Sequence, residues 1–172
     1  MPISVVLYHL ALSCWLGGAA LFTFVLTPKL FSVYSRDQAG AIVGFLFPGY
    51  FRWGLVCGVV ALVCLLINRG RFAAVSLAVL LFMLALTGTQ AYVLEPRAAA
   101  VKQHIASFTT TPKNDPHRLR FRRLHALSMA ANLAVIGGGV LLIVLAALPG
   151  PALTRSADHP VTTPPGATTL SR

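Results

Sequence analysis

Four long apolar runs dominate the pattern of hydrophobic and polar positions along the chain. They cover residues 3–27, 50–67, 72–94 and 124–148. Each is close to the roughly 20 residues that a helix needs to cross the hydrocarbon core of a bilayer. Because lipid offers backbone groups no hydrogen-bonding partner, each run must be helical. The pattern predicts an all-α integral membrane protein, a four-helix bundle within a transmembrane domain of residues 1–148.

The polar segments between the runs carry local helix signals. Pro28 predicts the end of the first span, and Ser35 with Gln38 has the spacing of a capping box ahead of the apolar stretch 39–47. We therefore expect a short interfacial helix between spans one and two. Asp115, directly before a proline, predicts the start of the last helix.

Composition supports lipid as the solvent of this chain. Hydrophobic residues make up 56% of it and charged residues 10%, whereas a soluble domain carries about 25% charged residues. Lys and Arg outnumber Asp and Glu by 14 to 4, which gives a net charge of +10. These bases flank the apolar runs, so we expect anionic lipid headgroups, not nucleic acid, as their partner.

The distribution of basic residues predicts the orientation in a cell membrane. Most of them lie in or beside the loops after spans one and three, namely Lys29, Arg36, Arg52, Arg97, Lys102, Lys113, Arg118, Arg120, Arg122 and Arg123. By the positive-inside rule these loops are cytoplasmic, and both termini lie outside the cytoplasm. Residues 149–172, rich in Pro and Thr, then form a disordered external tail.

Small residues predict where the spans pack. Gly54 and Gly58 form a Gly-x-x-x-Gly motif in span two, at about the depth of Gly17 and Gly18 in span one. Such motifs let transmembrane helices approach closely. We expect spans one and two to touch, and a homodimer could form through the same kind of face.

Polar side chains inside the spans are the candidate functional site. His125, Ser128 and Asn132 are spaced i, i+3 and i+7, which places them on one face of the last span. Thr87 and Gln90 in span three lie toward the same side of the membrane. Because buried polar groups need partners, these residues either line a pocket that faces the cytoplasm or fix the packing by hydrogen bonds between helices.

Two charged residues end span three beside this candidate site. Glu95 is the acidic residue nearest the membrane core, and Arg97 follows it. We expect Glu95 to pair with a base such as Arg97, Lys29 or Arg52 and not to act in catalysis.

Two residue types raise the question of a bound metal or haem. His9 lies about 9 Å below the outer surface, where haem ligation is one reading of a membrane histidine. It cannot share an iron with His125, which lies near the opposite face about 20 Å away. Cys57 and Cys64 are about 10 Å apart along one helix, too far to chelate one ion. Cys14 could approach one of them and give at most a weak, transient site for a soft metal. We therefore predict no metal site, with haem b through His9 kept as an alternative.

No enzyme motif is recognisable in the sequence. There is no Walker loop, no Cys-x-x-Cys motif and no paired carboxylate. We name no catalytic residue and interpret the protein as non-enzymatic.

Four short strings, each at a span boundary or face, occur in a familiar order. They are Tyr8-His9-Leu10, Leu46-Phe47-Pro48-Gly49-Tyr50-Phe51, Leu94-Glu95-Pro96-Arg97 and Arg123-Leu124-His125. Over residues 5–145 the chain resembles the transmembrane protein 205 family, including bacterial relatives grouped under the domain of unknown function numbered 4149. The resemblance implies a four-span membrane protein of unestablished biochemical activity, whose animal member is associated with tolerance to platinum drugs. The loop between spans three and four is shorter here.

A second resemblance is confined to span one. His9 followed by Trp15-Leu16-Gly17-Gly18 is similar to the copper-resistance D proteins and to the membrane protoporphyrinogen oxidase that binds haem. It implies a redox role.

Three hypotheses follow. The leading one is a protein that handles, or confers tolerance to, a small solute or soft metal at the polar face of spans three and four. The second is a haem-binding redox protein with His9 as axial ligand. The third is a structural membrane component whose Arg118–Arg123 segment binds anionic lipid or a cytoplasmic partner.

Overall fold

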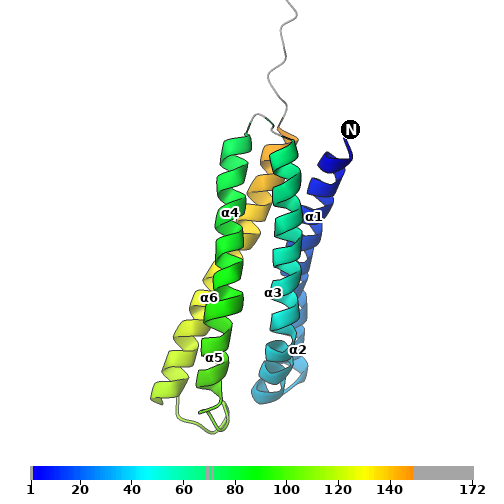
Figure 1. Ribbon diagram of the computed structural model, residues 1–172. Coiled ribbons are helices and arrows are strands. Elements are labelled where there is room, and N and C mark those ends of the chain that lie inside the picture. Colours follow the sequence, from blue (N-terminus) through cyan, green and yellow to red (C-terminus); the bar gives the residue numbers. More distant parts are fainter. Residues whose placement is uncertain (1, 69, 71, 149–172) are drawn as a thin grey trace, which may run out of the picture.

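The computed structural model describes residues 2–68, 70 and 72–148. Its four long helical rods run antiparallel, side by side (Figure 1). They cover Ile3–Val33, Arg36–Ile67, Ala73–Lys102 and Pro116–Ala147, and each is long and apolar enough to cross a membrane. The predicted four-helix membrane bundle is confirmed. The expected tail at 149–172 lies outside the described residues.

The first rod continues past the proline that was expected to end it. It consists of α1 (Ile3–Ala20), a π-helical segment η1 (Leu21–Leu26) and α2 (Thr27–Val33). Pro28 therefore does not terminate the helix, and that prediction is wrong. A proline ring clashes with the carbonyl four residues earlier, here Phe24. The wider turns of η1 lie where this clash would occur, and we attribute the continuity of the rod to them.

The third rod repeats this arrangement. It consists of α4 (Ala73–Thr89), the π-helical segment η2 (Gln90–Leu94) and α5 (Glu95–Lys102). Pro96 stands two residues after η2, as Pro28 stands two residues after η1. The helix thus extends eight residues beyond the apolar run, into the segment that carries Arg97 and Lys102.

The second rod is the single helix α3 (Arg36–Ile67). Its capping box is present as predicted, because Gln38 N donates to Ser35 Oγ (3.4 Å) and Ser35 N donates to Gln38 Oε1 (3.3 Å). Residues 39–47 are helical but continuous with the span, so no separate interfacial helix exists there. Pro48 lies inside α3 without ending it, as transmembrane helices often tolerate proline.

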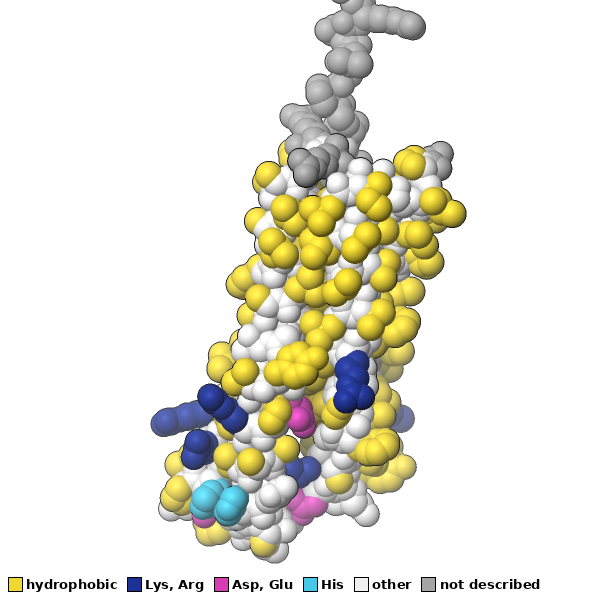
Figure 2. Space-filling view, in the orientation of Figure 1, with side chains coloured by type: hydrophobic (Ala, Val, Ile, Leu, Met, Phe, Trp, Pro, Cys, Tyr) yellow, Lys and Arg dark blue, Asp and Glu magenta, His cyan; other side chains and the backbone are white. Residues whose placement is uncertain are grey.

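The fourth rod is α6 (Pro116–Ala147). The Asp115 carboxylate accepts a hydrogen bond from Arg118 N at 3.0 Å, as expected for an N-cap. The starts of α3 and α6 lie at the same end of the bundle (Figure 1). Figure 2 shows the Lys and Arg side chains of the visible face gathered toward this end, with hydrophobic side chains covering the rest of the face. We call it the basic end.

The Trp15 indole of α1 packs against two glycines of α3, Gly54 and Gly58. Trp15 is 4% exposed. A Cβ at Gly54 would lie 2.7 Å from its Nε1, and a Cβ at Gly58 would lie 2.7 Å from its Cζ3 and 2.5 Å from Leu84 Cδ2. The Gly-x-x-x-Gly motif of α3 therefore lies where α1, α3 and α4 meet. A Cβ at Gly18 would lie 3.5 Å from Trp53 Nε1, whereas a Cβ at Gly17 would meet nothing within 4 Å.

Candidate functional site

Asn132 of α6 joins three of the four rods by hydrogen bonds. Its Oδ1 accepts from the Tyr50 hydroxyl of α3 at 2.5 Å. Its Nδ2 donates to Thr23 Oγ1 of η1 at 2.7 Å. One amide side chain thus satisfies both its donor and its acceptor groups within the bundle.

A further hydrogen bond between rods lies one turn away on α6. Ser128 Oγ donates to Gln90 Oε1, the first residue of η2, at 3.2 Å. Gln90 is 2% exposed, so its amide is enclosed by protein. Thr87, also buried, donates to Met83 O of its own helix at 2.9 Å. We use the name polar network for the side chains that hydrogen-bond to a side chain of another rod, namely Thr23, Tyr50, Gln90, Ser128 and Asn132.

A small cavity adjoins the polar network. Its lining combines polar and apolar side chains with one glycine, namely Trp15, Tyr50, Phe51, Gly54, Thr87, Gln90, Asn132 and Val135. The cavity measures about 10 Å³, which is near the lower limit for one water molecule. The conformation described here therefore has no room for a larger ligand.

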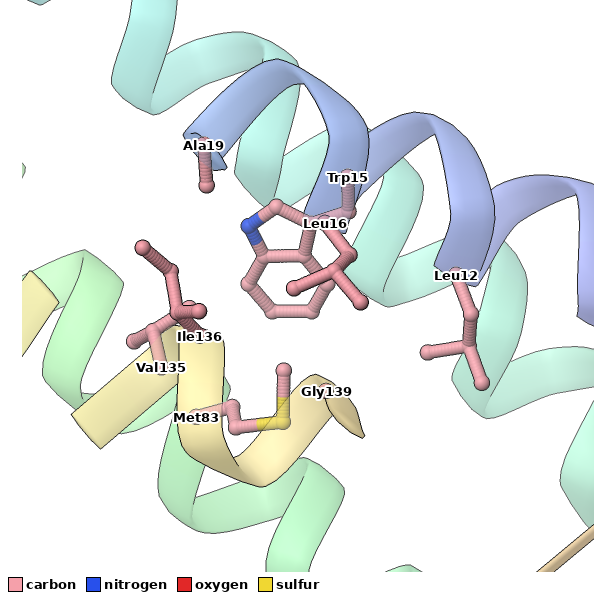
Figure 3. Close-up of a pocket in the computed structure, with 8 residues that line it drawn as sticks. All are labelled: Leu12, Trp15, Leu16, Ala19, Met83, Val135, Ile136 and Gly139. Carbon is pink, nitrogen blue, oxygen red and sulfur yellow. The ribbon is translucent and has the colours of Figure 1, made fainter. Parts of the chain in front are cut away.

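A neighbouring pocket toward the other end of the bundle is apolar. Figure 3 shows Leu12, Trp15 and Leu16 of α1 facing Met83 of α4 and Gly139 of α6. These side chains leave no space for a water molecule. The polar network thus ends against a dry, apolar core on this side.

Aromatic rings pack beside the polar network toward the basic end. The Phe22 ring stacks on Tyr50 with centroids 4.7 Å apart, and the Phe47 ring stacks on Phe51 at 5.4 Å. Phe22 and Phe47 also contact each other at 5.6 Å. These rings hold the Tyr50 hydroxyl toward Asn132.

Both π-helical segments supply a member of the polar network. Thr23 lies within η1, and Gln90 begins η2. Single π turns inside α-helices occur often at functional sites, because they shift the direction of the side chains that follow. Their coincidence with the hydrogen bonds between rods marks this depth of the bundle as the candidate site.

Four of the predicted site residues lie outside the polar network: Thr87, which bonds within its own helix and lines the cavity, and His125, Glu95 and Arg97. His125 is exposed on α6, with its ring 6.0 Å from that of Phe121. At the basic end, where α2 and α5 lie (Figure 1), α2 packs on α3 and α5 packs on α6. Neither covers the exposed side chain of His125. Arg97 is exposed, and Glu95 forms no ion pair with another described residue. Tyr50 and Thr23 join the site instead.

The candidate ligands for haem and metal lie elsewhere. His9 is exposed on α1, and its Nδ1 contacts Val5 O of the same helix at 2.7 Å. Cys57 and Cys64 belong to the apolar core, with Cys14 packed against it. Among the residues that the structure describes, no three His, Cys, Asp or Glu side chains gather as metal ligands. Haem binding by His9 stays a prediction.

One arginine of the basic segment at the start of α6 has a structural role. Arg118 is 8% exposed, donates to Thr111 O and lies 6.0 Å from the centre of the Phe108 ring. In the same loop, Ser107 Oγ and Phe108 N donate to the Asp37 carboxylate at 2.6 and 2.8 Å. These bonds fasten the loop after α5 to the starts of α3 and α6. Arg118 is therefore buried and is not available to lipid, unlike the exposed arginines of the Arg118–Arg123 segment.

Comparison with known proteins gives a family without an assigned activity. Residues 10–107, more than half of the chain, match the family described as domain of unknown function DUF4149. An uncharacterized protein of Aquifex aeolicus (strain VF5) is 31% identical over 139 residues, which cover 77% of this chain and 91% of the relative. No solved structure matches. On the family match and this relative, the chain belongs to the DUF4149 family.

Proposed function

We propose that this protein handles a small, neutral, polar solute within the membrane, without enzymatic chemistry, and that the solute binds at the polar network. The observation that carries the proposal is the convergence of Thr23, Tyr50 and Asn132 from three rods beside one cavity. A buried polar site in a membrane protein is a functional candidate because burying such groups costs free energy.

The chemistry of the polar network selects the class of solute. Its members carry hydroxyl and amide groups, which donate and accept hydrogen bonds but are uncharged at neutral pH. An ion would find no opposite charge there. A soft metal has less support, because the thiols of Cys57 and Cys64 pack in the apolar core and not at the cavity.

Binding requires the bundle to open, because the cavity of about 10 Å³ admits at most one water molecule. The π-helical segments offer a place for this movement, since they interrupt regular α-helical bonding in the first and third rods at the depth of the site. A solute with a donor and an acceptor could replace the bonds of Asn132 as the rods separate. The resemblance to the transmembrane protein 205 family, with its link to drug tolerance, is consistent with solute handling.

The test is solute permeation through proteoliposomes. Vesicles are exposed to gradients of urea, formamide or glycerol, and the rate of volume recovery is followed by light scattering. We expect faster recovery than in empty vesicles for at least one solute, and a loss of most of this increment in Asn132→Leu. His125→Leu, a polar-to-apolar change on the same helix outside the polar network, is the matched control and should leave the rate unchanged.

A packing role alone would give another result. Asn132→Leu would then lower the melting temperature. The wild type would not speed the permeation of any of these solutes, and none of them would raise its melting temperature. That outcome would reject the proposed function.

A further inference from the structure

One face of α3 carries a continuous exposed stripe with a single charge in it. Successive members are separated alternately by four and three residues, as on one side of a helix. They are Phe45, Gly49, Arg52, Val56, Val59, Val63 and Leu66. We call this set the outer stripe. It lies opposite Gly54 and Gly58, which face α1 and α4, so in a membrane it meets lipid.

Arg52 sits deeper in the bundle than the basic residues of the neighbouring rods. Gly58 of α3 lies against Leu84 of α4, and the two rods run in opposite directions. Arg52 lies six residues from Gly58 toward the basic end, and Gln90 lies six residues from Leu84 in the same direction. Arg52 and Gln90 therefore lie at the same depth. Arg97 follows Gln90 by seven residues, about 10 Å further toward the basic end.

The hydrogen bond between Ser128 and Gln90 extends this comparison to α6. Ser128 lies at the same depth as Gln90. The first basic residue toward the basic end is Arg123, five residues or about 8 Å away. Arg52 is thus placed about 8–10 Å inside the level of Arg97 in α5 and Arg123 in α6.

Arg52 has no counter-ion among the residues that the structure describes. No hydrogen bond or ion pair joins it to another described residue, and its neighbours along the outer stripe are apolar or glycine. An arginine stays protonated in proteins, and a lone charge within the apolar layer is costly. In the described part of the chain this charge is unpaired, which leaves the guanidinium open to an anion from the membrane.

We propose that Arg52 binds the phosphate of an anionic phospholipid and draws this headgroup inward beside α3. The guanidinium suits a phosphate because it donates two parallel hydrogen bonds, and a long side chain can extend toward the interface. The chain's net charge of +10 favours an anionic lipid over a zwitterionic one. The bilayer adapts to such a site by thinning locally.

A second copy of the chain fits this face less well. A two-fold interface formed around Arg52 would set two arginines against each other with no acidic residue of the outer stripe between them. Like charges in an apolar interface repel strongly. The charge of the outer stripe therefore favours a lipid as its occupant.

Trp53 provides the readout. It is 52% exposed and adjacent to Arg52, whereas the other tryptophan, Trp15, is 4% exposed. The protein is reconstituted in phosphatidylcholine vesicles, and a brominated phosphatidylglycerol is titrated as a quencher of tryptophan fluorescence. We expect saturable quenching, with an apparent affinity about tenfold weaker in Arg52→Gln, as for the loss of a charge-assisted hydrogen bond. Arg120→Gln, an exposed arginine of α6, should behave like the wild type.

Three outcomes would overturn the proposal. One is equal quenching of the wild type and Arg52→Gln. Another is equal quenching by brominated phosphatidylcholine, which would show that the anionic headgroup is not selected. The third is efficient disulfide crosslinking of Val56→Cys between copies together with no lipid quenching, which would identify the outer stripe as a protein interface. Because Arg52→Gln removes a charge from an exposed site, correct folding is expected and is checked by gel filtration.

Discussion

The Tyr50 hydroxyl donates a hydrogen bond of 2.5 Å to Asn132 Oδ1, although the two residues are 82 positions apart. This bond connects the middle of α3 to α6, and Asn132 passes the connection on to Thr23 in the first rod. Its two partners leave the Asn132 side chain one orientation that satisfies both of them. The site is therefore preorganised by residues that are distant in the sequence.

Replacing Tyr50 with Phe removes one donor and little volume. We expect the free energy of unfolding to fall by about 0.6–1.5 kcal/mol, because Asn132 Oδ1 loses its partner inside the bundle. Thermal unfolding in detergent, followed by size-exclusion chromatography, measures the change. Tyr92→Phe is the control, since Tyr92 is 73% exposed. An equal effect of both substitutions would contradict the assigned role of the bond.

Local patterns in the sequence predict much of this fold. The four apolar runs predict the rods, and Ser35 and Asp115 begin helices as their spacing indicates. These features depend on residues within a few positions of each other. The prediction for Pro28 is wrong because a proline normally ends a helix, and nothing local signals that η1 lets the first rod continue. Segment 39–47 is not a separate helix because α3 continues through Pro48.

The candidate site is predicted only in part for the same reason. The spacing of Ser128 and Asn132 places both on one face, and both join the polar network. His125 has the same spacing but is exposed, because its cover depends on where α2 and α5 lie at the basic end. Thr23 is one of several hydroxyl side chains in the first apolar run, and its role depends on packing against α6.

The contact between Trp15 and Gly58 predicts a steep response to one methyl group. Gly58→Ala would place a Cβ 2.5 Å from Leu84 Cδ2 and 2.7 Å from the indole. We expect a loss of about 1–3 kcal/mol in the free energy of unfolding, as for other overpacked cores. Gly44→Ala in the same helix is the matched control, because its Cβ would meet nothing within 4 Å. A similar melting temperature for both variants would refute the close approach.

The bonds to Asp37 predict how the loop after α5 is held. Asp37→Ala removes the acceptor of Ser107 Oγ and Phe108 N. We expect faster hydrogen exchange at the Phe108 amide and faster tryptic cleavage after Lys113. Ser32→Ala is a suitable control, because Ser32 bonds only within the first rod, to Lys29 O. Unchanged exchange at Phe108 in Asp37→Ala would mean that the loop is fastened by other contacts.

The relation between Pro28 and Thr23 predicts an energetic coupling across a helix turn. If the Pro28 ring widens η1 through its clash with the Phe24 carbonyl, Pro28→Ala allows regular α-helix there. The side chain of Thr23 would then turn away from Asn132. The polar network would lose its contact with the first rod.

A double-mutant cycle measures this coupling. Thr23→Val should destabilise the wild type by about 1 kcal/mol through loss of the bond to Asn132, and should have little effect in the Pro28→Ala background. Pro48→Ala is the control background, because Pro48 lies in α3, which is α-helical from Arg36 to Ile67. An equal cost of Thr23→Val in all three backgrounds would show that packing against α6, not Pro28, maintains η1.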